Sequence, residues 1–144
     1  MTRFMVAVFA YLVPTFALGF VWHLVLFEQY YEALAIYRSN IIIPFGFLSM
    51  LIQAVIFARI YERTFAQREG AFLSRTLGYG ALGAALSWSF TTLAVAAKNV
   101  MASVPNYLLI ETGFTIVQWI MVGPLTVLAF RQPMRRDEQS RTVG

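Results

Sequence analysis

The sequence predicts an all-α fold, a four-helix transmembrane bundle with both termini in the cytoplasm. Of the 144 residues, 59% are apolar and only 12% are charged, which is not typical of a soluble domain. Charged residues divide the chain into four long uncharged runs. Basic residues gather on one side of the resulting topology, so membrane orientation explains the net charge of +4 better than a nucleic-acid-binding face does.

Each uncharged run is long enough to cross a bilayer as a helix. A helix needs roughly 20 residues to cross about 30 Å of hydrocarbon. The runs contain 24, 20, 22 and 19 residues and extend over Phe4–Phe27, Ser39–Ala58, Thr76–Ala97 and Thr112–Phe130. With flanking residues included, we predict one domain over 1–130, with spans at about 4–27, 40–61, 75–97 and 107–130.

The segment between the first two spans predicts a short interfacial helix. Within Glu28–Ser39, Tyr30, Leu34 and Tyr37 recur at helical spacing. Phenol side chains favour the headgroup boundary of a membrane. We therefore expect an outer aromatic belt that contains Tyr30, Tyr31, Tyr37 and Tyr107.

The third span carries small residues on one face. Gly78–Gly83 reads G-x-G-x-x-G, but it does not follow a strand, so a dinucleotide-binding turn is discarded. Gly80, Ala84, Ser87 and Thr91 instead recur at i, i+4, i+7 and i+11, a stripe that lets membrane helices approach closely. The stripe can serve a helix of the same chain or a second copy, and we expect a homodimer or larger oligomer.

The fourth span is expected to begin before its uncharged run. Pro105 and Asn106 interrupt the chain, so the helix should start near Tyr107 and place Glu111 roughly one turn inside it. Residues 131–144, with clustered charge and no apolar period, are predicted to form a basic cytoplasmic tail.

The distribution of basic residues predicts the orientation. Nine lie on the side of the termini and the middle loop, and two lie on the opposite side. Cytoplasmic loops carry the excess of Lys and Arg, so both termini are predicted to be cytoplasmic. The nine are Arg3, Arg59, Arg63, Arg68, Arg75, Arg131, Arg135, Arg136 and Arg141, and the two are Arg38 and Lys98.

Two residue types limit the chemistry. The chain has no cysteine, which excludes disulfides, thiol catalysis and iron–sulfur clusters. The single histidine, His23, excludes a bis-histidine haem or a histidine-rich metal cage within one chain. We predict no catalytic residue, no metal site, no cofactor and no nucleic-acid partner.

Polar residues concentrate near the outer ends of the spans. Charged groups at membrane depth are costly, so they normally pair inside a bundle or line water. Glu111, Thr115 and Gln118 share one helix face and extend this polar line toward the middle of the bilayer. The candidate ligand-binding residues are His23, Glu28, Glu32, Arg38, Gln53, Lys98, Glu111, Thr115 and Gln118.

Three interpretations of this cluster are open. In the first, ion pairs fasten the outer helix ends, with Glu111 and Lys98 as the expected pair. In the second, Glu111 and His23 titrate protons in a binding or transport site. In the third, the cluster is catalytic. We favour a non-enzymatic membrane protein whose outer cluster fastens the bundle and binds a small polar ligand or a partner. The alternatives are a proton-coupled small-molecule transporter subunit and a membrane-embedded enzyme.

Two stretches carry a resemblance to a family. Gly19–Phe27 reads GFVWHLVLF and is followed by Tyr30 and Tyr31, and Ile43–Gln53 reads IPFGFLSMLIQ. They resemble small four-span bacterial membrane proteins of unknown function. The resemblance covers the first half of the chain and implies the architecture but no activity. We expect a multi-pass protein of the cell membrane, of the bacterial inner-membrane type, whose partner is the lipid bilayer.

Overall fold

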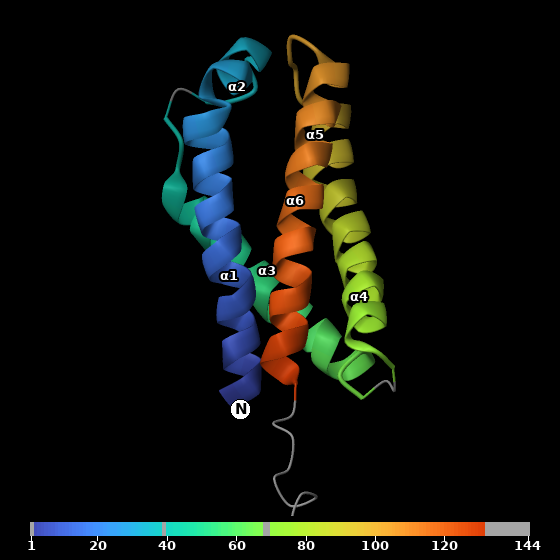
Figure 1. Ribbon diagram of the computed structural model, residues 1–144. Coiled ribbons are helices and arrows are strands. Elements are labelled where there is room, and N and C mark those ends of the chain that lie inside the picture. Colours follow the sequence, from blue (N-terminus) through green and yellow to red (C-terminus); the bar gives the residue numbers. More distant parts are fainter. Residues whose placement is uncertain (1, 39, 68–69, 132–144) are drawn as a thin grey trace, which may run out of the picture.

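The computed structural model describes residues 2–38, 40–67 and 70–131, and this part of the chain folds into helices without strands (Figure 1). Four helices are long and apolar enough to cross a membrane: Thr2–Leu26, Ile43–Thr64, Phe72–Lys98 and Val104–Phe130. Each coincides with one predicted span, with no end displaced by more than three residues. The predicted tail lies outside the described residues beyond Arg131.

Two of the long helices contain a π-helical segment near the end of the bundle that lies opposite the N-terminus, and this end is called the outer end below. The first consists of α1 (Thr2–Val21) and η1 (Trp22–Leu26), and the third consists of α4 (Phe72–Ser87), η2 (Trp88–Leu93) and α5 (Ala94–Lys98). The second and fourth are α3 (Ile43–Thr64) and α6 (Val104–Phe130), and the short α2 (Glu28–Leu34) follows η1. π-Helical turns inside α-helices are frequent at functional sites.

The helices pack around α6 and α1 and not in simple chain order. α6 packs against α1 on one side and α4 on the other, and α3 packs against α1. In Figure 1, α3 runs obliquely behind α1 and α6 and approaches α4 at the lower end only. α3 and α4 are therefore consecutive in the chain but contact each other mainly at that end, where Tyr61 and Phe65 pack against Tyr79.

The start of α6 corrects the predicted break at Pro105. α6 begins at Val104 with Pro105 in its first turn, and the side chain of Ser103 caps the helix by accepting a hydrogen bond from the Asn106 N–H at 3.4 Å. Proline is favoured in the first turn because its nitrogen has no hydrogen to leave unpaired. Glu111 therefore lies roughly two turns inside the helix rather than one.

The middle of the bundle is held by aromatic rings around Trp119 of α6. The Trp119 ring contacts Tyr11, Phe57 and Tyr79, which come from α1, α3 and α4, with ring centroids 4.8–5.9 Å apart. A Cβ atom on Gly83 would lie 2.0 Å from the indole, so only glycine leaves room for the ring.

The small-residue stripe of the third span is used within the chain. Ser87 accepts a hydrogen bond from the Trp119 indole at 3.1 Å, and the carbonyl oxygen of Thr91 accepts one from the Tyr107 hydroxyl at 3.0 Å. Gly80 and Ser87 of the stripe therefore face α6, whereas Thr91 is exposed. Much of the contact face that motivated the oligomer prediction is thus used within the chain.

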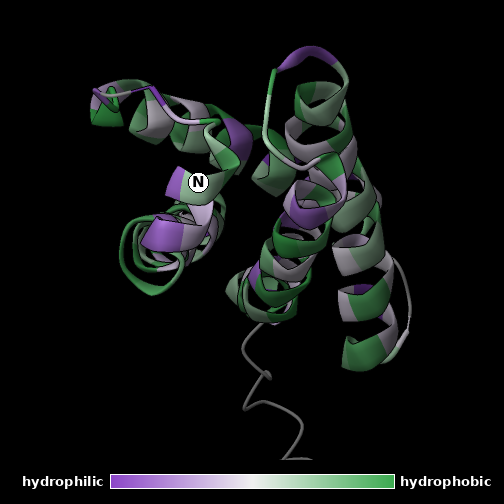
Figure 2. Ribbon diagram, turned by 90° about the horizontal axis from the view of Figure 1, so that it is seen from above, coloured by the Kyte–Doolittle hydropathy of each residue, from purple (hydrophilic) through white to green (hydrophobic). Residues whose placement is uncertain are grey.

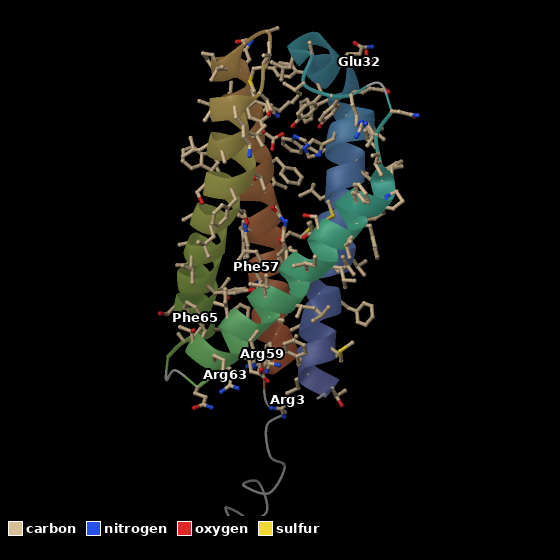
Figure 3. The ribbon with its side chains drawn as sticks, turned by 180° about the vertical axis from the view of Figure 1, so that it is seen from behind. Arg3, Glu32, Phe57, Arg59, Arg63 and Phe65 are labelled. Carbon is tan, nitrogen blue, oxygen red and sulfur yellow. The ribbon has the colours of Figure 1, made fainter. Side chains whose placement is uncertain are left out.

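The N-terminus, the end of α6 and several basic residues lie at the same end of the bundle. In Figure 1 the N-terminus and the end of α6 lie at the bottom, and Figure 3 shows Arg3, Arg59 and Arg63 at that end and Glu32 at the opposite end. Figure 2 shows hydrophobic residues on the outward faces of the helices. Exposed side chains such as Phe45, Leu109 and Ile120 form this apolar exterior.

Candidate functional site

The candidate site is centred on the carboxylate of Glu111, near the outer end of α6. The Tyr31 hydroxyl donates a hydrogen bond to Glu111 Oε1 at 2.6 Å, and His23 Nε2 lies 3.3 Å from the same oxygen. Glu111 is only 7% exposed. The three side chains come from α6, α2 and η1, so this cluster connects three separate segments at the outer end of the bundle (Figure 1).

The π-helical turn η1 carries His23 toward α6. Its wider hydrogen bond runs from the Phe27 N–H to the Trp22 carbonyl oxygen at 3.0 Å. The Trp22 ring packs against Phe27 and against Phe114 of α6, with centroids 4.6 and 5.9 Å apart. His23 Nδ1 lies 2.9 Å from the Gly19 carbonyl oxygen, one helical turn earlier, which fixes the orientation of the imidazole.

Tyr31 is a buried member of the site that the sequence interpretation assigned to an aromatic belt. Tyr31 and Leu34 are the buried residues of α2, and Tyr107 is also buried, so the belt prediction is wrong for Tyr31 and Tyr107. Burial, followed by the nearby charge of Glu111, raises the pKa of the Tyr31 phenol. The phenol therefore stays protonated and donates to Glu111 at physiological pH.

The predicted ion pair between Glu111 and Lys98 is wrong. Among the described residues, the ion-pair partner of Glu111 is His23, and Lys98 is exposed at the end of α5 without a carboxylate in reach. The Trp88 indole donates to Thr112 Oγ1 at 2.9 Å, so Glu111 lies level with the start of η2. Lys98 lies ten residues further along the third helix and is therefore closer to the outer end than Glu111.

Three other predicted residues line a pocket beside His23 and form no ion pairs with the described residues. Glu28, Glu32 and Arg38 are exposed and line an outer pocket of about 380 Å³ that also reaches His23 and Tyr31. None of the three forms an ion pair with another described residue. They are therefore available to water and to a ligand.

A second, apolar cavity of about 500 Å³ lies between α1 and the first half of α3, and it is open at the surface, where the lining residues Phe20, Ile42 and Phe47 are exposed. It shares His23, Tyr37 and Arg38 with the outer pocket. Its remaining lining is apolar and includes Phe16, Phe20, Ile42, Phe47 and Met50. The cavity thus has polar groups at its outer end and an apolar body.

The remaining predicted residues lie deeper and form a separate network. Gln118 Nε2 donates to the Tyr11 hydroxyl at 3.3 Å and to Thr15 Oγ1 at 3.4 Å. The Tyr11 hydroxyl donates to Gln53 Oε1 at 2.9 Å. Gln53 of α3 is therefore connected to the polar face of α6 through the Tyr11 hydroxyl.

Thr115 belongs to neither group, because its hydroxyl donates to the carbonyl oxygen of Glu111 within α6 at 2.9 Å. The structure thus brings His23 and Glu111 together, places Gln53 and Gln118 in the middle network, and leaves Lys98 apart. The residues that sequence reasoning missed are Tyr11, Thr15 and Tyr31. The i, i+3 spacing of Tyr31 and Leu34 was the available signal for Tyr31.

In comparisons with known proteins, no family model, curated protein or solved structure matches this chain. The resemblance to small four-span bacterial membrane proteins therefore stays a prediction, and the function is argued from the site alone.

Proposed function

We propose that the chain is a non-enzymatic integral membrane protein, with cytoplasmic termini, that binds a small amphipathic anion at the outer side of the membrane. The cluster of Glu111, His23 and Tyr31 fastens the bundle beside the binding site. The basic end with Arg3, Arg59 and Arg63 supports the orientation. The four long apolar helices support the membrane location.

The observation that carries this proposal is the apolar cavity whose outer end contains Arg38. Ligand sites are typically apolar clefts of about 300 to 1,000 Å³ with a few polar groups that set orientation. The cavity of about 500 Å³ fits this description. Arg38 is exposed and has no ion-pair partner among the described residues, so its guanidinium is free to bind an acidic headgroup. The expected ligand therefore has an apolar body and a single carboxylate or phosphate.

Paired probes test both halves of this proposal. We would measure the affinities of laurate and of the uncharged dodecanol by displacement of a fluorescent fatty acid from the full chain in nanodiscs. The wild type should bind laurate more tightly than dodecanol. Arg38→Gln should weaken laurate binding about tenfold or more and leave dodecanol unchanged, because a hydrogen bond to a charged group contributes about 1.5 to 3 kcal/mol.

A second variant tests the cavity itself. Gly46 lines the cavity, and a Cβ atom there would meet no other atom within 4 Å, so Gly46→Leu fills the space without a clash. It should abolish the binding of both probes. Arg63→Gln, at the opposite end of the bundle, is the matched control and should change neither affinity. Equal binding of both probes by wild type and Arg38→Gln would contradict the anionic ligand, and unchanged binding by Gly46→Leu would contradict the cavity.

A further inference from the structure

The position of one hydrogen on His23 follows from its backbone contact. Nδ1 lies 2.9 Å from the Gly19 carbonyl oxygen. A carbonyl oxygen can only accept a hydrogen bond, so Nδ1 carries the hydrogen of this contact. Neutral imidazole has only one N–H, and Nε2 of a neutral His23 would therefore be a bare acceptor.

The opposite nitrogen faces another acceptor. His23 Nε2 lies 3.3 Å from Glu111 Oε1. An ionised carboxylate is an acceptor only, so a bare Nε2 and an ionised Glu111 would direct two lone pairs at each other in a site with little water. One additional proton removes the conflict. It rests either on Nε2, which then donates to the carboxylate, or on Oε1, which then donates to Nε2.

We infer that His23 and Glu111 form a proton-binding site that holds a single proton between Nε2 and Oε1. With this proton the pair has no net charge in either arrangement, which lowers the cost of a carboxylate at membrane depth without Lys98. The Tyr31 hydroxyl donates to Oε1 in both arrangements. The inference depends on these contacts alone and not on the ligand proposed above.

The surroundings of the pair give the proton a route from the outer side. The His23 side chain is 21% exposed and the Glu111 side chain 9%, so His23 is the more accessible partner. Titratable and charged groups face the pair from α2 and the following loop, and Tyr107 lies near Glu111 on α6. The groups that line the outer pocket with His23 are Glu28, Tyr31, Glu32, Tyr37 and Arg38.

The single histidine makes the test direct, because labelling with ¹⁵N-histidine gives one imidazole spectrum. The full chain in nanodiscs at neutral pH would be studied by solid-state NMR, with a dipolar correlation from Nε2 to the nearest carboxyl carbon to identify Glu111 in the wild type. We expect Nδ1 to be protonated. We also expect either a protonated Nε2 beside an ionised carboxylate, or a bare Nε2 beside a protonated carboxyl group.

Two variants test whether His23 and Glu111 share a proton or only lie close together. In Glu111→Gln the amide can donate to Nε2, so His23 should become neutral, with its hydrogen on Nδ1. Glu32→Gln removes a carboxylate from the same pocket and should leave the imidazole spectrum unchanged. A bare Nδ1, or a bare Nε2 beside an ionised Glu111, would overturn the inference, and both are decided in the wild-type chain even if a variant fails to fold.

Discussion

Two parts of α6 place polar side chains inside an apolar bundle, and they use different chemistry. In the outer third, Glu111 contacts His23 and Tyr31. In the middle, Gln118 contacts Tyr11 and Thr15. The outer group contains an ionisable pair, whereas the middle group consists of amides and hydroxyls. The middle network therefore needs no proton to be satisfied, but the outer cluster does.

Because of this difference, the two regions should respond differently to substitution and to pH. Neutral hydrogen bonds between membrane helices contribute about 0.6 kcal/mol on average, so losing one is tolerable. Removing one partner of a buried ionic pair typically costs about 3 to 5 kcal/mol, because the other partner is left uncompensated. The free energy of unfolding should consequently depend strongly on polar substitutions and on pH at the outer end. In the middle it should depend on the volume of the side chains.

The largest effect is expected from Glu111→Leu. It removes the acceptor of both Tyr31 and His23, so the free energy of unfolding should fall by about 3 to 5 kcal/mol. Steric trapping in bicelles measures this loss. The exposed Glu32→Leu serves as the control, and a loss for Glu111→Leu no larger than that of the control would show that the outer cluster is solvated.

The stability of the middle region should depend most on side-chain volume, and Gly83→Ala tests this expectation. Its new Cβ atom would lie 2.0 Å from the Trp119 ring, so the ring or α4 must shift. Overpacking of this kind costs about 1 to 3 kcal/mol. Gly46→Ala, which has open space around its Cβ, is the matched control in the same unfolding measurement. Equal stability of the two variants would refute the close packing of Trp119 on α4.

The pH dependence of stability should distinguish the two regions. Burial, followed by the nearby charge of Glu111, raises the pKa of the Tyr31 phenol in the folded chain. Above about pH 10, where free phenols ionise, the unfolded chain loses this proton and the folded chain keeps it. Stability should thus fall as pH rises through this range, by at most about 1.4 kcal/mol per pH unit for one proton. Unfolding free energies measured in the alkaline range should show this slope in the wild type and in Gln118→Leu, and a weaker slope in Glu111→Gln, which removes the nearby charge.

A smaller loss of stability is expected when hydrogen bonds of the middle network are removed. Gln118→Leu removes the donor to Tyr11 and Thr15 but keeps a side chain of similar size, so stability should decrease by about 1 kcal/mol or less. The same unfolding assay measures it against Glu111→Leu. If Gln118→Leu were as damaging as Glu111→Leu, the distinction between the two regions would fail.

The smallest effect concerns the end of α2, which holds Tyr31 over the site. Ala35 follows α2 in the left-handed region, with φ of 55°. Glycine adopts this conformation without the steric cost that alanine bears, so Ala35→Gly should raise stability by less than about 1 kcal/mol. Thermal unfolding in detergent reports the change, and a clear decrease would show that other contacts of Ala35 outweigh its backbone strain.

Much of the fold could be predicted from the sequence because charge spacing reports which segments contact lipid. The four spans follow from it, whereas the start of α6 did not, since Pro105 both interrupts helices and begins them. The site was predicted only in part. Residue order places Glu111 and Lys98 near the same end of the bundle, but their separation along it depends on where α6 begins, so the partner of Glu111 was misassigned. The spacing of Tyr31 and Leu34 indicated a shared face of α2, but the residues that this face covers depend on how α2 packs over η1.

The pairing of the first and last long helices sets an order of events during synthesis. The hydrogen bonds of Gln118 to Tyr11 and Thr15 join residues 107 and 103 positions apart, so they form only when the final helix has been made. Until then, the Tyr11 hydroxyl can already donate to Gln53 of α3, whereas Thr15 has yet to meet its partner on α6. A polypeptide truncated before α6 therefore keeps the contact between α1 and α3 but leaves the face of α1 around Thr15 uncovered.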